Sequence, residues 1–334
     1  MKYKILSVLI FTLNTSLFAQ SKFPEKYSPN KFNNGQSIFD IVNVPEEKID
    51  VGLWSLIIAK EFDNSIDVNY YLNKLDEMSK EIKRMLAGRN KDMDKFLATK
   101  TFLYETGEWN NYNIFSYDLA DPLGNILEHQ LLPNYIDTKK GNCVSMPTLF
   151  LVLMKRVDPA IQFLGVKAPL HLFCRLKDRQ TGDVWNIEAT NGGNPARNQW
   201  YIDKMQISQK ALDNKLYLKD LTNKEFIAEL IGTLVAKERR KGNLEKAIKY
   251  TDLVLKLNPN SDMGLVNKGA ISAEIAYNKS QNETLSEEEN KYYKEETEKN
   301  IEKAKELGWK PESEKEREKY IESVNTERSK TEDK

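Results

Sequence analysis

Cys143 is the side chain of this sequence best suited to act as a nucleophile. It follows Gly141 and Asn142 and precedes an apolar run at residues 148–154, which is the pattern of a thiol at the entry of a buried helix. Asn accepts a hydrogen bond from an N–H of the first turn, and the positive end of the helix dipole stabilises a thiolate there. The alternative is a small buried hydrophobe, as most free cysteines are. Pro147 leaves the helix start open, because a proline ring clashes with the carbonyl four residues earlier.

A general base and a carboxylate come from a predicted β-hairpin. Residues 169–176 and 183–190 each alternate between apolar and polar side chains and are separated by a polar turn. If the turn residues are 178–181, the numbers of paired residues add to 359, and His171 lies opposite Glu188 with the Cβ atoms about 5 Å apart. A sum of 361 keeps the two on one face as diagonal neighbours. An odd number of turn residues would put them on opposite faces.

Cys174 is predicted to point to the other, apolar face of this hairpin. Cys143 must approach the His171 face to work with the imidazole, whereas a disulfide to Cys174 requires the opposite face, so one pairing excludes the other. The disulfide stays open as the structural alternative, because an oxidising compartment permits it. The predicted neighbours of Cys174 are Leu172, Leu176, Trp185 and Ile187.

Cysteine, histidine and glutamate together can perform acyl transfer. Cys143 would attack a carbonyl carbon, and the His171 imidazole would remove the thiol proton and later protonate the leaving group. Glu188 would orient the ring and stabilise the imidazolium. The backbone N–H of Cys143, at the helix start, is a natural donor to the oxyanion.

Five further residues are predicted to contact the substrate. Asn191, Gly192 and Gly193 directly follow the second strand, and glycines there allow close approach of a backbone. A plain strand-ending turn is the equal alternative. Asn142 beside the nucleophile and Trp109 in a polar and aromatic loop complete the set.

Three segments resemble the transglutaminase-like superfamily of the papain-like fold, and in particular its bacterial branch with a C-terminal tetratricopeptide region. They are residues 140–145 (KGNCVS), 169–173 (PLHLF) and 186–193 (NIEATNGG). The resemblance covers about residues 40–205. It implies an α+β fold, with a central helix against an antiparallel sheet and additional helices on the N-terminal side.

The resemblance also implies a thiol acyl-transfer site with Cys143 as nucleophile, His171 as base and Glu188 as the third member. The family usually has Asp at the third position, so this sequence departs from the pattern by one methylene. Members of the superfamily include proteases, amidases, transamidases and proteins that have lost activity. The resemblance therefore says more about the site than about the reaction.

Amphipathic helices are predicted on the N-terminal side of the cysteine, at residues 54–62, from a cap at Asp67 to Gly88, and at residues 91–107. Such helices cover an apolar layer rather than standing alone.

A further helix, through residues 126–132, carries His129, which we interpret as a histidine of the surface or behind the site. Asp118 and Asp121 are weak candidates for metal ligands, and turn formation at Asp121-Pro122 is favoured.

The C-terminal part, residues 222–311, is predicted to be a tetratricopeptide-like helical region. Residues 228–261 fit one repeat of about 34 positions, with Gly242 in the turn and Pro259 at the end. A degenerate second copy begins at Asp262. The region is either a groove for a protein partner or a cap on the core. Residues 312–334 form a charged tail.

Residues 1–19 have the pattern of a secretory signal peptide, with Lys2 and Lys4 before an apolar stretch and Ala19 at the cut. Export follows from it, to the periplasm if the source is Gram-negative, with no membrane span after cleavage. Residues 20–37 are a polar lead-in, and residues 38–215 are the predicted transglutaminase-like domain with its helical N-terminal part.

Composition excludes some classes of function. The 50 Lys and Arg balance 50 Asp and Glu, so nothing indicates a nucleic-acid partner. The 2 histidines and the lack of a ligand cluster predict no metal and no cofactor. The main hypothesis is an exported cysteine-type amide or peptide hydrolase or transamidase acting on a peptide, a protein or a cell-envelope component. The alternative is a non-catalytic protein that binds a peptide or envelope component.

Overall fold

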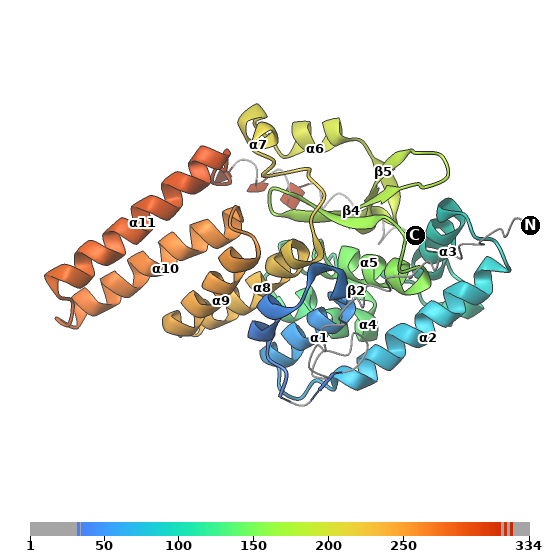
Figure 1. Ribbon diagram of the computed structural model, residues 1–334, viewed down its shortest axis with the longest axis horizontal. Helices are drawn as coiled ribbons and strands as arrows, with labels where there is room; N and C mark the ends of the chain where they lie inside the picture. Colours follow the sequence, from blue (N-terminus) through green and yellow to red (C-terminus); the bar gives the residue numbers. More distant parts are fainter. Residues whose placement is uncertain (1–31, 34, 315–316, 319–320, 323–334) are drawn as a thin grey trace, which may run out of the picture.

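The computed structural model describes residues 32–33, 35–314, 317–318 and 321–322 (Figure 1). The predicted signal peptide, most of the lead-in and the end of the charged tail lie outside these residues. The elements of the N-terminal half are α1 (Val51–Phe62), α2 (Val68–Leu86), α3 (Asp92–Tyr104), β1 (Ser116–Tyr117), α4 (Leu132–Thr138), β2 (Lys140–Gly141) and α5 (Ser145–Val157). Those that follow are β3 (Phe163–Ala168), β4 (His171–Lys177), β5 (Val184–Glu188), β6 (Asn194–Ala196), α6 (Asn198–Lys204), α7 (Gln209–Asp213), α8 (Asn223–Arg240), α9 (Leu244–Leu257), α10 (Asp262–Gln281) and α11 (Glu287–Leu307).

Helix α5 is the centre of the fold. Every residue from Ser145 to Met154 is buried. The helix is apolar on all sides, so each of its sides packs against other parts of the protein. Helices α1 to α4 pack on one side of α5, and strands β3 and β4 pack on the other. The predicted α+β class with a central helix against an antiparallel sheet is confirmed.

The sheet has the order β3-β4-β5-β6, with antiparallel neighbours throughout. Its inner face, which carries Cys174, packs on α5 and α8. Its outer face, which carries Phe173, is covered by α6 and α7 in Figure 1. Gly165 on β3 allows this packing, since a Cβ there would lie 2.1 Å from the ring of Phe226 on α8.

Helix α2 begins where the sequence predicts, because the Asp67 side chain accepts a hydrogen bond from Tyr70 N at 3.1 Å. The single helix predicted through residues 126–132 is wrong. Leu127–Gln130 form a short 3-10 helix, and α4 starts separately at Leu132 with Pro133 in its first turn. Proline has no N–H for a preceding turn, but its fixed φ suits the first turn of a new helix.

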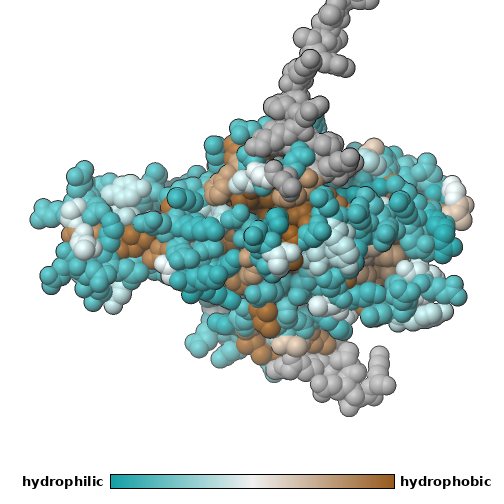
Figure 2. All heavy atoms as spheres, turned by 90° about the horizontal axis from the view of Figure 1, so that it is seen from below, coloured by the Kyte–Doolittle hydropathy of each residue, from teal (hydrophilic) through white to brown (hydrophobic). Residues whose placement is uncertain are grey.

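The C-terminal helices form two antiparallel pairs, α8 with α9 and α10 with α11. Gly242 provides the turn of the first pair with a φ of +75°, a conformation that glycine adopts without strain. Helix α8 packs on α1 and β3, whereas α10 and α11 extend away from the core (Figure 1). The surface of this projecting end is mainly hydrophilic (Figure 2). The tetratricopeptide assignment itself stays a prediction.

A buried charged cluster joins the sheet to these helices. The Lys167 ammonium on β3 lies 2.7 Å from Oε2 of Glu229 on α8 and also pairs with Asp262, the first residue of α10. Tyr217 donates to Oδ2 of Asp262 at 2.6 Å. All three charged side chains are less than one-tenth exposed. Buried ion pairs therefore connect the C-terminal helical region to the core.

Candidate active site

The loop that carries Cys143 is held by hydrogen bonds on both sides. Gly141 O accepts from Asp118 N at 2.7 Å, so the loop follows directly from the short β1–β2 pair. The Asn142 side chain accepts from Val144 N at 2.9 Å, and Asn142 O accepts from Met146 N at 3.0 Å. Val144, not Asn142, is the N-cap of α5, but the Asn142 side chain binds backbone N–H groups at the entry of the helix, as its type predicts.

Cys143 lies at the N-terminal end of α5, although not inside its first turn as predicted. The helix starts at Ser145, and Pro147 fits as the third residue, where a missing N–H does no harm. The Cys143 thiol is partly exposed, and Sγ lies 3.7 Å from the carbonyl oxygen of Leu170. Within the described part of the chain, no acceptor takes the backbone N–H of Cys143, which leaves that N–H available to an oxyanion.

His171 and Glu188 meet at the end of the hairpin. Nε2 of His171 lies 2.7 Å from Oε2 of Glu188. The prediction that they are directly opposed is wrong, because the ladder pairs Cys174 with Ile187 and the residue numbers add to 361. The alternative register holds, with the two side chains as diagonal neighbours on one face. The extra methylene of glutamate helps to span this diagonal.

Glu188 has hydrogen-bond donors on both carboxylate oxygens. Oε1 accepts from Thr190 N at 3.1 Å and from Thr190 Oγ1 at 2.7 Å. Oε2 accepts from the Tyr201 hydroxyl at 2.9 Å in addition to its contact with His171. Tyr201 itself stacks on Phe173, with the ring centroids 4.1 Å apart. The carboxylate is thus fixed in position and its charge is stabilised.

The charges of this pair support one another. Burial alone would lower the pKa of His171, but the Glu188 carboxylate and the Cys143 thiol raise the pKa to about 10. Burial alone would raise the pKa of Glu188, but the imidazolium and Thr190 hold that pKa below its ordinary value. The imidazolium is therefore the favoured form at neutral pH, and an imidazolium stabilises a neighbouring thiolate.

The signs of these shifts determine how stability depends on pH. The folded state binds the His171 proton more tightly than the unfolded state, so this contribution is complete below pH 6.5 and is lost as the pH rises through about 10. The Glu188 contribution is present above pH 4.5 and is lost as the pH falls through the lowered pKa.

The Glu188→Gln substitution is expected to shift the titration of His171 to lower pH. With only 2 histidines in the chain, the ring signals can be followed by NMR and assigned with a His129→Gln variant. The wild-type His171 inflection is expected near pH 10. In Glu188→Gln, burial is opposed only by the Cys143 thiol, and the inflection should fall well below that of the wild type.

The control for this titration is Asp118→Asn, since Asp118 lies beside His129 rather than beside His171. It should leave the His171 inflection in place. An unchanged inflection in Glu188→Gln would contradict the ion pair.

Cys174 is a core residue and both cysteines are free thiols, which overturns the disulfide alternative. The Cys174 side chain is fully buried on the inner face of the sheet, its thiol donates to Pro147 O at 3.4 Å, and burial raises its pKa well above the ordinary value. Leu172, Leu176 and Ile187 share this core as predicted, but Trp185 is 39% exposed, which corrects the prediction that it packs there.

Of the remaining predicted residues, Gly193 and Trp109 contact α3. Gly193 has a φ of +70°, and a Cβ there would lie 3.1 Å from Phe150 and 3.3 Å from Tyr104. Asn191 ends a 3-10 turn and Gly192 follows it with a φ of +61°. The Trp109 indole donates to Thr101 O at 3.2 Å and packs over Gly107, which ties it to α3 rather than to the Cys143 loop.

His129 is part of a second histidine–carboxylate cluster behind the Cys143 loop. Its Nδ1 lies 2.8 Å from Asp118 Oδ2 and 3.7 Å from Asp121 Oδ2, and its backbone carbonyl accepts from Ser145 Oγ at 2.9 Å. Both aspartates also accept hydrogen bonds from the backbone, Asp118 from Ala120 N and Asp121 from Asn125 N. Their side chains therefore stabilise turns, as predicted. The pairing of His129 with Asp118 and Asp121 was not predicted, because the spacing of these residues in the sequence does not match the period of a helix or a strand.

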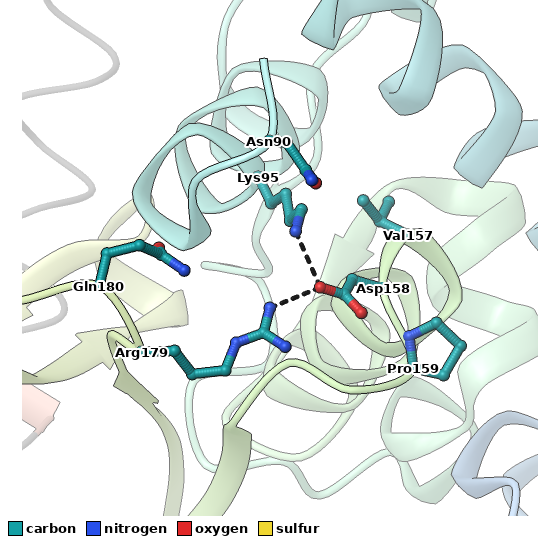
Figure 3. A pocket seen from close by; sticks show the side chains of 7 residues that line it. All are labelled: Asn90, Lys95, Val157, Asp158, Pro159, Arg179 and Gln180. Carbon is teal, nitrogen blue, oxygen red and sulfur yellow. Dashed lines mark hydrogen bonds and ion pairs between the residues drawn. The ribbon is translucent and has the colours of Figure 1, made fainter. Parts of the chain in front are cut away.

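An open cavity of about 560 Å³ lies at the other end of α5 from Cys143 (Figure 3). Its Asp158 follows the last residue of α5 and pairs with Lys95 at 2.8 Å and Arg179 at 2.6 Å. Asp92 also pairs with Arg179, so two carboxylates neutralise the two cations, and we interpret the cavity as a structural contact between α3, α5 and the β4–β5 turn. The lining residues are Asn90, Lys95, Val157, Asp158, Pro159, Arg179 and Gln180.

Across the described ranges, no group of three or more His, Cys, Asp or Glu side chains is arranged to hold a metal ion. In the same part of the chain, no helix combines the length and the apolar character that crossing a bilayer requires.

Residues 69–232 match the sequence model of a family described as "Transglutaminase-like superfamily". The chain is 26% identical over 225 residues to the UPF0162 protein YchA of Escherichia coli, covering 65% of this chain and 76% of that protein. It is 25% identical over 208 residues to the protein SirB1 of Salmonella typhimurium, covering 61% and 71%. No solved structure gives a significant match. The family match contains the Cys143 loop, His171 and Glu188 and ends within α8.

Proposed function

This chain belongs to the transglutaminase-like superfamily through residues 69–232, and on that premise we propose that it is an exported cysteine-dependent enzyme that hydrolyses or transfers an amide or peptide bond. The observation that carries the proposal is the 2.7 Å contact between His171 and Glu188 at the end of the strand, with the Cys143 thiol beside the same ring. Nucleophile, base and orienting carboxylate are the groups that such chemistry requires.

The proposed reaction has two steps. The Cys143 sulfur attacks the carbonyl carbon, and the Cys143 N–H stabilises the resulting oxyanion. His171 gives its proton to the departing amine, so the C–N bond breaks and a thioester to Cys143 remains. Water or a second amine then attacks the thioester and gives a proton to the neutral His171, the C–S bond breaks, and the Cys143 thiolate is released beside the restored imidazolium.

The orientation of the His171 ring supports these roles. Because Nε2 faces Glu188, Nδ1 is the nitrogen available to the thiol and the leaving group. Export rests on the signal-like pattern of residues 1–19 and directs the search for substrate to cell-envelope peptides and extracellular proteins.

Iodoacetamide at pH 7 is expected to label Cys143 in the folded protein and to leave Cys174 unmodified. Cys143 is partly exposed beside an imidazolium, whereas Cys174 is fully buried and its pKa is raised. Peptide mass spectrometry after a short exposure distinguishes the two sites. Equal labelling of both thiols, or of neither, would count against the proposal.

The acyl step is then tested by trapping. Wild-type protein incubated with a cell-envelope extract and quenched in acid should carry a thioester adduct on Cys143, and the Cys143→Ala protein should carry none. A partner that binds the Cys143→Ser protein tightly while wild type forms no adduct and turns over no substrate would favour the non-catalytic binding alternative.

A further inference from the structure

Leu170, directly before His171, is an exposed leucine in a backbone conformation that leucine rarely adopts. Its φ is +53°, and its exposed fraction is 74%. The left-handed region crowds Cβ against the backbone of every residue except glycine, and such strain persists where the surrounding structure or a function maintains it. A bulky apolar side chain is thus held in water, in a strained conformation, one residue from the candidate base.

The turn that contains Leu170 does not require leucine. Ala168 pairs with His171 across β3 and β4, so Pro169 and Leu170 are the two turn residues. Proline suits the first position of a type II turn, and the second position needs a positive φ that Gly or Asn supplies with little strain. Folding alone would therefore favour a smaller or more polar residue at this position.

The backbone of Leu170 is also in contact with the candidate nucleophile. Its carbonyl oxygen lies 3.7 Å from Cys143 Sγ. A second exposed apolar residue lies on the α6 side of the site, where Trp200 is 45% exposed and packs edge-on against Tyr201, with the ring centroids 4.9 Å apart. Tyr201 in turn holds Glu188. Exposed apolar side chains therefore border the His171–Glu188 pair both at the β3–β4 turn and near α6.

We propose that Leu170 is a specificity-determining contact for an apolar side chain next to the scissile bond of the substrate. The inference rests on the proposed function and narrows its substrate class to amides whose acyl part carries an aliphatic or aromatic group beside the attacked carbonyl. Such a group would cover the exposed leucine and remove apolar surface of both partners from water, which a polar group cannot do favourably.

The test compares two alkylating reagents on Cys143. Iodoacetamide is small and polar, and N-hexyl-iodoacetamide adds an apolar chain; in both cases the sulfur displaces iodide. The ratio of their second-order rate constants cancels the intrinsic reactivity of the thiol. Relative to wild type, Leu170→Asn is expected to lower the ratio for the hexyl reagent by about fourfold or more, since one buried CH₂ contributes about that factor. Leu170→Met should keep the ratio.

Val184→Asn is the matched control. Val184 is 58% exposed and pairs with Lys177, at the end of the β4–β5 ladder far from His171. Its ratio should equal that of wild type. An equal ratio in wild type and Leu170→Asn, or an equal loss in Val184→Asn, would overturn the proposal. Even an unactivated Cys143 yields a ratio, so Leu170 is tested independently of whether the enzyme proposal fails.

Thermal stability provides the second readout. Asn tolerates a positive φ better than Leu, and the exposed side chain contributes little burial, so Leu170→Asn should raise the melting temperature by about 2–3 °C. A fall of several degrees would mean that Leu170 serves the fold, and the specificity role would be rejected.

Discussion

Replacing His171 by alanine is expected to slow amide turnover by about 10²–10⁴-fold, because the general base and acid is lost. Alkylation of Cys143 at pH 7 should also slow, because the imidazolium that stabilises a neighbouring thiolate is gone. Alkylation is measured by mass spectrometry, so this experiment needs no known substrate. A wild-type alkylation rate in His171→Ala would contradict the imidazole–thiol pair.

Two further variants separate chemistry from folding. The His171→Gln variant keeps a hydrogen-bond donor for the buried Glu188 carboxylate, so its melting temperature should fall less than that of His171→Ala, whereas its reactivity should be lost to the same extent. The His129→Ala variant removes the other histidine, whose ring faces Asp118, and should keep the wild-type alkylation rate. Equal losses in both histidine variants would indicate a general disturbance of the Cys143 loop.

The Lys167→Ala substitution is expected to destabilise the protein by about 3–5 kcal/mol at pH 7.5, because it leaves two buried carboxylates without their cation. Glu229 and Asp262 are both less than one-tenth exposed, and Oε1 of Glu229 already has no hydrogen-bond partner in the described part of the chain. The free energy of unfolding is measured by urea denaturation. Lys291→Ala is the control, since Lys291 is 78% exposed and pairs with Glu295 at the surface, where such pairs contribute about 0–1 kcal/mol.

The pH dependence of this loss follows from the charges. Burial raises the pKa of Glu229, whereas Lys167 holds the pKa of Asp262 below its ordinary value despite burial. Without Lys167, both carboxylates favour protonation in the folded state, so the destabilisation should grow as the pH rises above about 4.5. A loss no larger than that of Lys291→Ala, or one independent of pH, would show that the Lys167 cluster does not hold the C-terminal helices on the core.

The local parts of the fold follow from sequence patterns. Asp67 as a cap, the alternating strands around His171 and the buried helix after Cys143 were predicted because each depends on neighbouring residues. The shared face of His171 and Glu188 was also predictable, since both even-length turns preserve it. The exact register was not, because it depends on which polar residues of the turn join the ladder.

The approach of Cys143 to His171 was predicted by an argument that the structure corrects. We expected Cys143 to lie on the His171 face of the hairpin. Instead α5 packs on the Cys174 face, and Cys143 reaches the imidazole around the end of the strand. The face on which a side chain lies does not determine its contacts at the end of a strand, because a loop there can reach side chains of both faces.

Polar contacts between residues far apart in the chain could not be predicted from the sequence. Lys167 and Asp262 are 95 positions apart, and nothing in either local pattern indicates that they share a buried pair. His129 was interpreted as a histidine of the surface or behind the site, and its pairing with Asp118 was not predicted for the same reason, since this partner precedes it in an irregular segment. Trp109 was assigned to substrate contact from its type alone, and the structure places its indole against α3.

The burial of Cys174 has a consequence for oxidation. The chain contains 2 cysteines. The second, Cys174, is fully buried on the inner face of the sheet, where its thiol donates a hydrogen bond to the backbone oxygen of Pro147. A sulfenic acid formed on Cys143 therefore has no internal thiol with which to condense. Peroxide would carry it on to the irreversible sulfinic and sulfonic acids unless a small external thiol intervenes first. The same separation that keeps Cys143 free for chemistry leaves it without a resolving partner of its own.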